Sequence, residues 1–177
     1  MRPDEAANHS SENPERPSPK PAEQSRVSLA IITDPGQANA FGTLHGGVLL
    51  RLADECGAVA ALRHAGRGQI TTAAIDSMTF LSPVYVGERV ELQAEVTYVG
   101  RSSIESRIVI SAEGLLGDRR RKVAEGYGLY VSLDDSGASP TPVPPLAVET
   151  EADRRRDEAA KARQAVRLAR RAEANAG

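Results

Sequence analysis

Residues 39–54 read NAFGTLHGGVLLRLAD, and this stretch decides how the rest of the chain folds. A polar loop ends in Gly46 and Gly47 and leads directly into a run of aliphatic residues that continues to His64. The run is apolar on nearly every side, which predicts a helix over residues 46–64 that is buried inside the protein. Gly66, just beyond the last turn, is typical of the residue that ends a helix.

Five segments around this helix have the composition of strands, one before it and four after it. In most of them apolar and polar residues alternate, which is the period of a strand with one buried face. The five segments are residues 27–32, 70–81, 90–98, 104–110 and 123–133. Because no helix separates the last four, we expect an antiparallel sheet. The simplest solution is an α+β fold in which a curved sheet wraps one long helix, and such a small unit is expected to dimerise through a sheet edge.

The remaining segments flank this unit, which we place at residues 26–135. Residues 1–25 hold five of the eleven prolines and no large apolar residue after Met1, so a disordered arm is expected. Residues 136–148 contain four prolines and predict a stiff, extended linker. Residues 149–177 predict a charged helix with acidic residues at its start and basic ones at its end, which suits the helix dipole. The sequence leaves open whether this helix packs on a neighbouring subunit or lies in solvent.

Composition narrows the classes of function. The net charge of −2 and the scarcity of aromatic residues (two Phe, four Tyr, no Trp) argue against a nucleic-acid partner. No apolar run approaches the roughly 20 residues that span a bilayer, and no secretory signal is evident, so we expect a cytoplasmic protein without a membrane partner. A single cysteine, Cys56, and three histidines make a metal site improbable.

The start of the long helix carries the candidate chemistry. Backbone N–H groups at a helix start are unpaired, and Gly46 and Gly47 would let a substrate oxygen approach them, as an oxyanion hole requires. The alternative is that the glycines serve only a tight turn or close packing. Asp54 lies two turns beyond Gly47 on the same helix face. A carboxylate in an apolar helix is costly unless it is paired or useful. Asp54 therefore acts either as a base or nucleophile, or as a cap for a loop amide.

Three other residues near the helix are weaker candidates. Asn39 has an amide able to donate to a carbonyl or hold a water, although asparagine is also common in turns. His45 is a neighbour of the helix cap, a packing residue or a substrate contact, and the sequence offers it no nucleophile to activate. Cys56 points away from Asp54 around the helix and is expected to be a small core residue.

Spacing and strand motifs together resemble a known family. The pattern Asn39-x-x-Gly42-x-x-His45-Gly46-Gly47, with Asp54 following, is similar to that of hotdog-fold acyl-CoA thioesterases. The similarity is to the acyl-CoA hydrolase branch that includes bacterial short-chain and mammalian brain-type enzymes. It extends through DSMTFLSPV at residues 76–84 and GRSS at residues 100–103, and it covers roughly residues 27–133.

The resemblance implies a composite active site at a dimer interface, with acyl-CoA as the substrate and no separate cofactor. Asn39 of one protomer and Asp54 of the other would face one thioester carbonyl, and the Gly47 amide would bind the oxyanion. His45 and Gly46 would line the same site. The turn formed by Gly100, Arg101, Ser102 and Ser103 would contact CoA, with Arg101 suited to a phosphate. Such enzymes commonly assemble as trimers of dimers, so a homohexamer is implied.

Two other functions compete with thioester hydrolysis. A hotdog hydratase or dehydratase would use a histidine of the helix together with an acidic residue, and the helix body lacks a histidine between Gly47 and Arg63. A non-catalytic acyl-CoA-binding regulatory module is the second alternative, and the presence of Asp54 counts against it.

Overall fold

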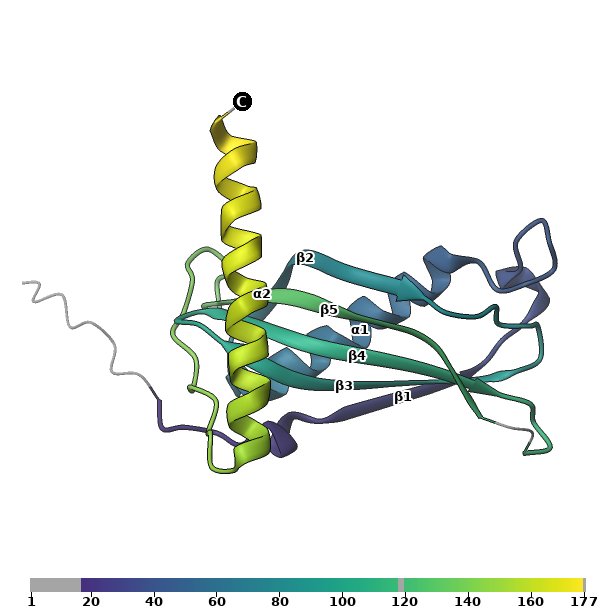
Figure 1. Ribbon diagram of the computed structural model, residues 1–177, viewed down its shortest axis with the longest axis horizontal. Coiled ribbons are helices and arrows are strands. Elements are labelled where there is room, and N and C mark those ends of the chain that lie inside the picture. The colour runs from purple at the N-terminus through teal and green to yellow at the C-terminus, as the bar shows by residue number, and fades with distance from the viewer. Residues whose placement is uncertain (1–16, 118–119, 177) are drawn as a thin grey trace, which may run out of the picture.

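The computed structural model describes residues 17–117 and 120–176 of the protein. Five strands form one antiparallel sheet in the order β1-β3-β4-β5-β2, and helix α1 runs along one face of it (Figure 1). The strands are β1 (Val27–Ile32), β2 (Gln69–Phe80), β3 (Arg89–Val99), β4 (Ser103–Glu113) and β5 (Arg121–Leu133). The helices are α1 (Gly46–Ala65) and α2 (Glu151–Ala176), with short 3-10 helices η1 (Ala22–Ser25) and η2 (Pro35–Gln37). The predicted α+β fold, with its antiparallel strands and C-terminal helix, is confirmed.

The core lies between α1 and the face of the sheet that the helix covers. Alternate residues of β3 and β4 point into it and are fully buried, among them Leu92 and Ile108. Tyr130 of β5 is buried at the centre, where its hydroxyl donates to the Asp54 backbone carbonyl at 3.2 Å. Gly57 of α1 and Gly128 of β5 leave space for this ring, because a Cβ at either would lie 2.3 Å from the Tyr130 hydroxyl oxygen. Two glycines therefore set how closely helix and sheet approach.

Only one side of α1 is covered. Leu50, Val59 and Leu62 are exposed on the other side. The prediction that the helix is buried on all sides is therefore wrong for a single chain, since the sheet of that chain reaches round only part of it. The predicted helix end is confirmed: Gly66 has a left-handed φ of 75°, and its N–H donates to the Leu62 carbonyl at 2.9 Å.

Residues 17–25 are ordered, so the prediction of a disordered arm is wrong for them; residues 1–16 lie outside the described residues. Lys20 pairs with the segment after β5, where its N–H donates to the Pro145 carbonyl at 2.9 Å. Ser25 is fully buried and hydrogen-bonds to Nδ1 of buried His64 at 3.0 Å. Nε2 of His64 lies 3.0 Å from the Pro144 carbonyl. Local composition predicted disorder because these partners come from distant segments.

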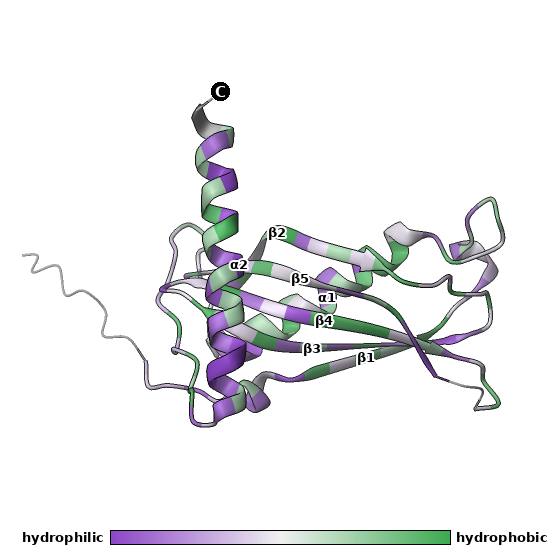
Figure 2. Ribbon diagram, viewed as in Figure 1, coloured by the Kyte–Doolittle hydropathy of each residue, from purple (hydrophilic) through white to green (hydrophobic). Residues whose placement is uncertain are grey.

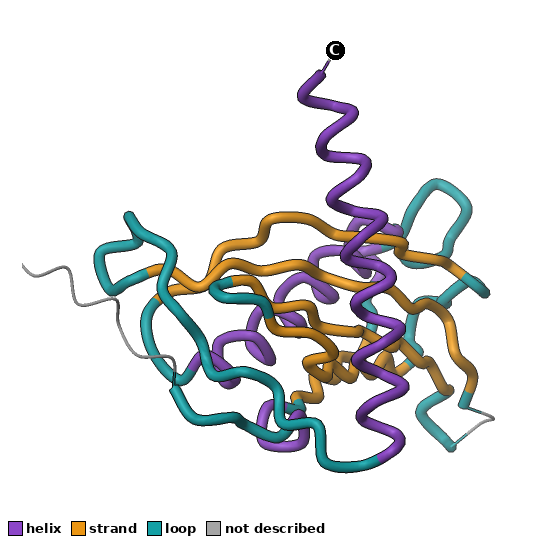
Figure 3. Tube along the Cα trace, turned by 60° about the vertical axis from the view of Figure 1, so that its left-hand side comes forward, coloured by secondary structure: helices purple, strands orange, loops and turns teal. Residues whose placement is uncertain are grey.

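The segment 136–148 is likewise not a free linker. Val143 is fully buried, and its N–H donates to the Arg101 carbonyl at 3.0 Å. This segment runs back over the end of the sheet and delivers α2 to the face opposite α1. Figure 3 shows α2 crossing that outer face at a steep angle to the strands.

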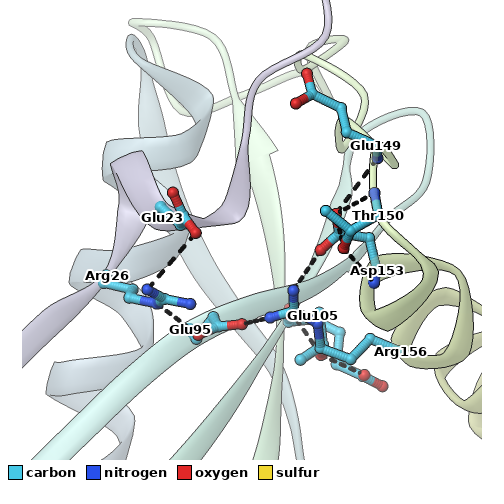
Figure 4. Close-up of polar contacts among 9 residues, drawn as sticks. Glu23, Arg26, Glu95, Glu105, Glu149, Thr150, Asp153 and Arg156 are labelled. Carbon is cyan, nitrogen blue, oxygen red and sulfur yellow. Dashed lines mark hydrogen bonds and ion pairs between the residues drawn. The ribbon is translucent and has the colours of Figure 1, made fainter.

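Helix α2 is held on the outer face by charges more than by apolar contacts. At its start, Thr150 caps the helix: its hydroxyl accepts from the Asp153 N–H at 3.1 Å, while its own N–H donates to the Asp153 carboxylate at 2.8 Å. The Thr150 hydroxyl also donates to this carboxylate at 2.7 Å, and that bond, followed by the one from the Thr150 N–H, holds the pKa of Asp153 down at about 2. Arg156 joins Asp153 to Glu95 of β3, and Glu95 in turn pairs with Arg26 (Figure 4). Figure 2 shows that the first half of α2 is mostly hydrophilic. In the described residues, no helix is long and apolar enough to cross a membrane.

Candidate active site

His45 caps the start of α1. Its Nδ1 accepts a hydrogen bond from the Gly47 N–H at 2.9 Å, so a neutral ring carries its proton on Nε2. Both residues are exposed to solvent. The Gly47 N–H, the predicted oxyanion donor, therefore already has an acceptor within its own chain. The Gly46 N–H donates no hydrogen bond to the described part of the chain.

Asn39 uses its side chain to shape the loop before α1. Its Oδ1 accepts from the Phe41 N–H at 2.9 Å and from the Thr43 N–H at 3.2 Å, while its Nδ2 donates to the Thr43 hydroxyl at 2.8 Å. A primary amide has two donor hydrogens. One of them is therefore left for a water or a substrate oxygen.

Asp54 lies half-buried on α1 and faces β2. Its Oδ1 accepts from the Thr72 hydroxyl at 2.8 Å, at the solvent-open edge of the sheet. Burial, and then the nearby Asp54 charge, raises the pKa of Tyr130, so that phenol stays protonated and donates to the helix. The neighbouring Glu55 is exposed and pairs with Arg51 at 2.6 Å. Asp54 is thus oriented by one hydroxyl and keeps lone pairs on its second oxygen.

Cys56 has no place in this site. It is buried on the core side of α1, and burial raises the pKa of its thiol to about 11. A thiol with so high a pKa is a poor nucleophile at neutral pH. The described residues also contain no cluster of three or more histidine, cysteine or carboxylate side chains suited to a metal ion.

An apolar cavity of about 330 Å³ opens beside the start of α1. Its walls come from the start of α1 and from the end of β2 with the loop that follows. The lining residues are Leu44, Gly46, Leu49, Phe80, Leu81, Ser82, Pro83 and Val84. Phe80, the last residue of β2, lies against Gly46: a Cβ there would be 3.7 Å from the ring.

The turn of residues 100–103 lies at the other end of the sheet. The Gly100 N–H donates to the Ser103 carbonyl at 2.8 Å, and the Ser102 carbonyl accepts from the Ser132 N–H at 2.8 Å. Arg101 is exposed. Helix α1 starts at one end of the sheet and finishes at this one, a length of roughly 30 Å for its 20 residues (Figure 1). One chain therefore does not bring this turn and the glycines together.

Comparison with known proteins identifies the family. The thioesterase superfamily model matches residues 41–116. A Bacillus subtilis protein named as an uncharacterized acyl-CoA thioester hydrolase, YkhA, is 34% identical over 137 residues, covering 77% of this chain and 78% of its own length. The chain belongs to the acyl-CoA thioester hydrolase family. The human cytosolic acyl coenzyme A thioester hydrolase is 31% identical over 149 residues, and the chain spans 39% of its length.

Solved structures of this family share the hotdog fold of the chain. An apo hexameric acyl-CoA thioesterase aligns with a TM-score of 0.81 and 36% identity, over 88% of this chain and 98% of that one. The Staphylococcus aureus acyl-CoA hydrolase, solved with butyryl coenzyme A and coenzyme A, aligns with a TM-score of 0.79 and 32% identity, over 88% and 94% of the two chains. Variants of that enzyme with an aspartate, an asparagine or a threonine replaced by alanine are also similar in structure.

Sequence reasoning missed two residues that the fold places beside the family motif. Thr72 orients Asp54, and Phe80 lies over Gly46. The β2 strand has a bulge between Thr72 and Ala74, which interrupts the alternation of inward and outward residues. The sequence pattern therefore does not show that Thr72 faces the helix. Phe80 gave a usable signal, since it is the one aromatic residue of its strand.

Proposed function

We propose that the chain hydrolyses acyl-CoA thioesters to a free fatty acid and CoA. The observation that carries the proposal is Asp54, held by Thr72 at an open sheet edge, in a chain whose relatives are named acyl-CoA thioester hydrolases. Asp54 would serve as base or nucleophile, Asn39 would position the water or the carbonyl, and a glycine N–H would bind the oxyanion.

Two chains would complete each site. Among the described residues, β2 is an edge strand that pairs only with β5. Asp54 contacts Thr72 in the first half of β2, whereas Gly46 contacts Phe80 at its last residue. If two β2 strands pair antiparallel about a two-fold axis, the first half of one lies beside the second half of the other. Asp54 of one chain then approaches Gly46 and the Asn39 loop of its partner. The same reversal carries the turn of residues 100–103 toward the partner's helix start, where Arg101 would meet the phosphates of CoA.

The chemistry follows from this arrangement. A water between Asp54 and the thioester attacks the carbonyl carbon as the carboxylate takes its proton. Negative charge develops on the carbonyl oxygen, which the N–H of Gly47 or Gly46 stabilises. The carbon–sulfur bond then breaks, and the proton passes from Asp54 to the CoA sulfur. In the nucleophilic variant the Asp54 carboxylate attacks the carbon itself, the carbon–sulfur bond breaks, and CoA leaves as its thiolate from a mixed anhydride. Water then hydrolyses the anhydride to the fatty acid and Asp54, and the proton released in that step goes to the CoA sulfur.

The cap on Gly47 sets a condition for this step. The N–H can bind the oxyanion only after the His45 ring turns away. The cavity beside Gly46 is apolar and adjacent to these donors, so it would receive the start of the acyl chain.

The spacing of the substituted residues in the S. aureus enzyme supports the assignment. The asparagine and the aspartate replaced there are separated by the same number of positions as Asn39 and Asp54 here. These residue types are therefore the ones to change first.

The test is CoA release from acyl-CoAs of several chain lengths by wild type, Asp54→Asn and, as a matched control, Glu55→Gln. We expect Asp54→Asn to reduce kcat at least about a hundredfold, the scale of general base catalysis, and Glu55→Gln to stay near wild type. Asn39→Ala and Asp54→Ala chains, each inactive, should regain about a quarter of wild-type activity when refolded together, because half the dimers are mixed and each holds one intact site. No CoA release by wild type would refute hydrolysis and leave the regulatory or hydratase alternatives.

A further inference from the structure

Among the described residues, the last turns of α2 contact their own chain only weakly, through Arg170 at 4.0 Å from Asp76. Arg167 is the last residue of the helix that is well anchored, with Nη1 at 3.2 Å from Asp76 of β2 and 2.6 Å from Glu105 of β4. Beyond it the helix continues past β2, the edge of the sheet, in both views (Figures 1 and 3). We call residues 168–176 the distal segment. At 1.5 Å per residue it extends roughly 13 Å beyond the last anchor.

The direction of the distal segment is fixed by the contacts that precede it. Arg156 pairs with Glu95 of β3, and Arg163 pairs with buried Glu105 at 2.7 Å while stacking 4.0 Å above the Tyr127 ring. These contacts hold α2 across β3, β4 and β5 in turn. The distal segment therefore points over whatever lies next to β2.

A second copy of the chain is the occupant that fits this position. β2 is a twelve-residue edge strand without proline, and such an edge needs a partner or a cover. Pairing with a second β2, as the proposed active site requires, continues the sheet and places the partner's β2 and β5 beneath the distal segment. A different protein on this edge would not place a continuation of the same sheet beneath the distal segment.

The surface chemistry agrees with that occupant. The distal segment carries Leu168, 56% exposed, and the cations Arg170 and Arg171. The outer face of β2 and β5 carries Asp76 and Glu125. Within the chain Asp76 already pairs with Arg167, and Glu125 with Arg107 and Lys122, so the face has paired charges of both signs. Arg170 already approaches Asp76 of its own chain at 4.0 Å, at the edge that the helix crosses. A helix end with two arginines, one glutamate and an exposed leucine would thus lie on a face that carries carboxylates beside Arg107 and Lys122.

We propose that the distal segment of α2 docks on the outer sheet face of a second copy, across the β2 edge. By two-fold symmetry each copy gives one segment and receives one. The proposal rests on the edge pairing of the proposed function, but not on hydrolysis.

Photo-crosslinking tests this contact in the full-length chain. A benzophenone amino acid replaces Leu168 in a mixture of ¹⁴N- and ¹⁵N-labelled chains, and mass spectrometry identifies crosslinks between chains. We expect mixed-isotope crosslinks to peptides of residues 69–80 or 121–133. The matched control places the same probe at Leu116, which is 99% exposed on the β4–β5 connection. Crosslinks from position 168 that fall only within one chain, only elsewhere in the second copy, or at the control level overturn the proposal.

Charge-reversal variants measure how much this contact stabilises the assembly. Arg170→Glu with Arg171→Glu should raise the concentration at which the assembly dissociates about tenfold by sedimentation, because like charges then face Asp76 and Glu125. Arg154→Glu with Arg155→Glu, the same change at the other end of α2, should leave it within about threefold. Equal effects from the two pairs contradict the docking. CoA release is measured on the same samples, so a retained activity with no crosslink refutes only this inference.

Discussion

Replacing Glu105 with glutamine should loosen α2 from the sheet. Glu105 is fully buried on β4 and makes three short contacts, two to arginines of α2 and one to Thr97 of β3. Its Oε1 lies 2.7 Å from both Arg163 Nη2 and the Thr97 hydroxyl, and its Oε2 lies 2.6 Å from Arg167 Nη1. An amide keeps the shape of the carboxylate but removes the charge that faces both guanidinium groups, while Asp76 still faces Arg167 at 3.2 Å.

The expected loss follows from the burial of the partners. The side chains of Arg163 and Arg167 are 24% and 11% exposed, so water compensates them poorly. Breaking a buried ion pair by removing one partner costs about 3–5 kcal/mol. Because Arg163 retains some access to water and α2 can release instead of staying docked, we expect about 3 kcal/mol.

Urea unfolding at pH 7, followed by circular dichroism, measures the free energy of unfolding, and limited proteolysis reports whether α2 is released. We expect Glu105→Gln to lose about 3 kcal/mol and to be cut within residues 151–176. Glu151→Gln is the control, since its pair with Arg154 is well exposed and worth less than about 0.5 kcal/mol. A loss below about 1 kcal/mol with no new cleavage in α2 would show that Glu105 does not anchor the helix.

Three further predictions concern the helix and the core. Gly57→Ala should destabilise the protein by about 1–3 kcal/mol in urea unfolding, because its Cβ would lie 2.3 Å from the Tyr130 hydroxyl oxygen; a gain in stability, as helix propensity alone predicts, would contradict the close packing. Burial lowers the pKa of His64, so its contribution to stability is complete above the unfolded value of about 6.5 and is lost at lower pH; unfolding measured from pH 7.5 to 5 should show this loss in wild type and in His45→Gln but less in His64→Gln. Cys56 should not react with a thiol reagent at pH 8 until urea is added, and rapid labelling of the native protein would refute its burial.

The helix and the strands could be predicted from the sequence because their signals are local. The aliphatic run after Gly47, the glycine at position 66 and the alternation in the later strands each reflect a residue's own neighbours. The order of the strands in the sheet, in contrast, could not be predicted from local signals. β2 follows α1 in sequence but lies at the edge beyond β5, a placement decided by packing between distant segments. Order in residues 17–25 was missed for the same reason, since it depends on His64 and on the chain after β5.

The same distinction between local signals and contacts of distant segments applies to the candidate site. Asn39 and Asp54 could be proposed as site residues from residue type and spacing, which a linear sequence shows directly. Glu105 was not singled out, because a charged residue at an outward strand position is ordinary until α2 brings Arg163 and Arg167 over it. The cap of His45 on Gly47 was also missed, since the ring's orientation is set by the loop and not by its neighbours in sequence.

That cap bears on how an enzyme tells a substrate from a transition state. A ligand that takes the Gly47 N–H must displace an imidazole nitrogen that already accepts its hydrogen. A neutral thioester carbonyl is a weak acceptor and gains little from this exchange, whereas an oxyanion gains a charge-assisted hydrogen bond. In the proposed mechanism the ring therefore weakens ground-state binding more than transition-state binding, and only the difference between the two accelerates the reaction. His45, which occupies the Gly47 N–H when no substrate is bound, would then favour acceptors that carry negative charge over neutral ones.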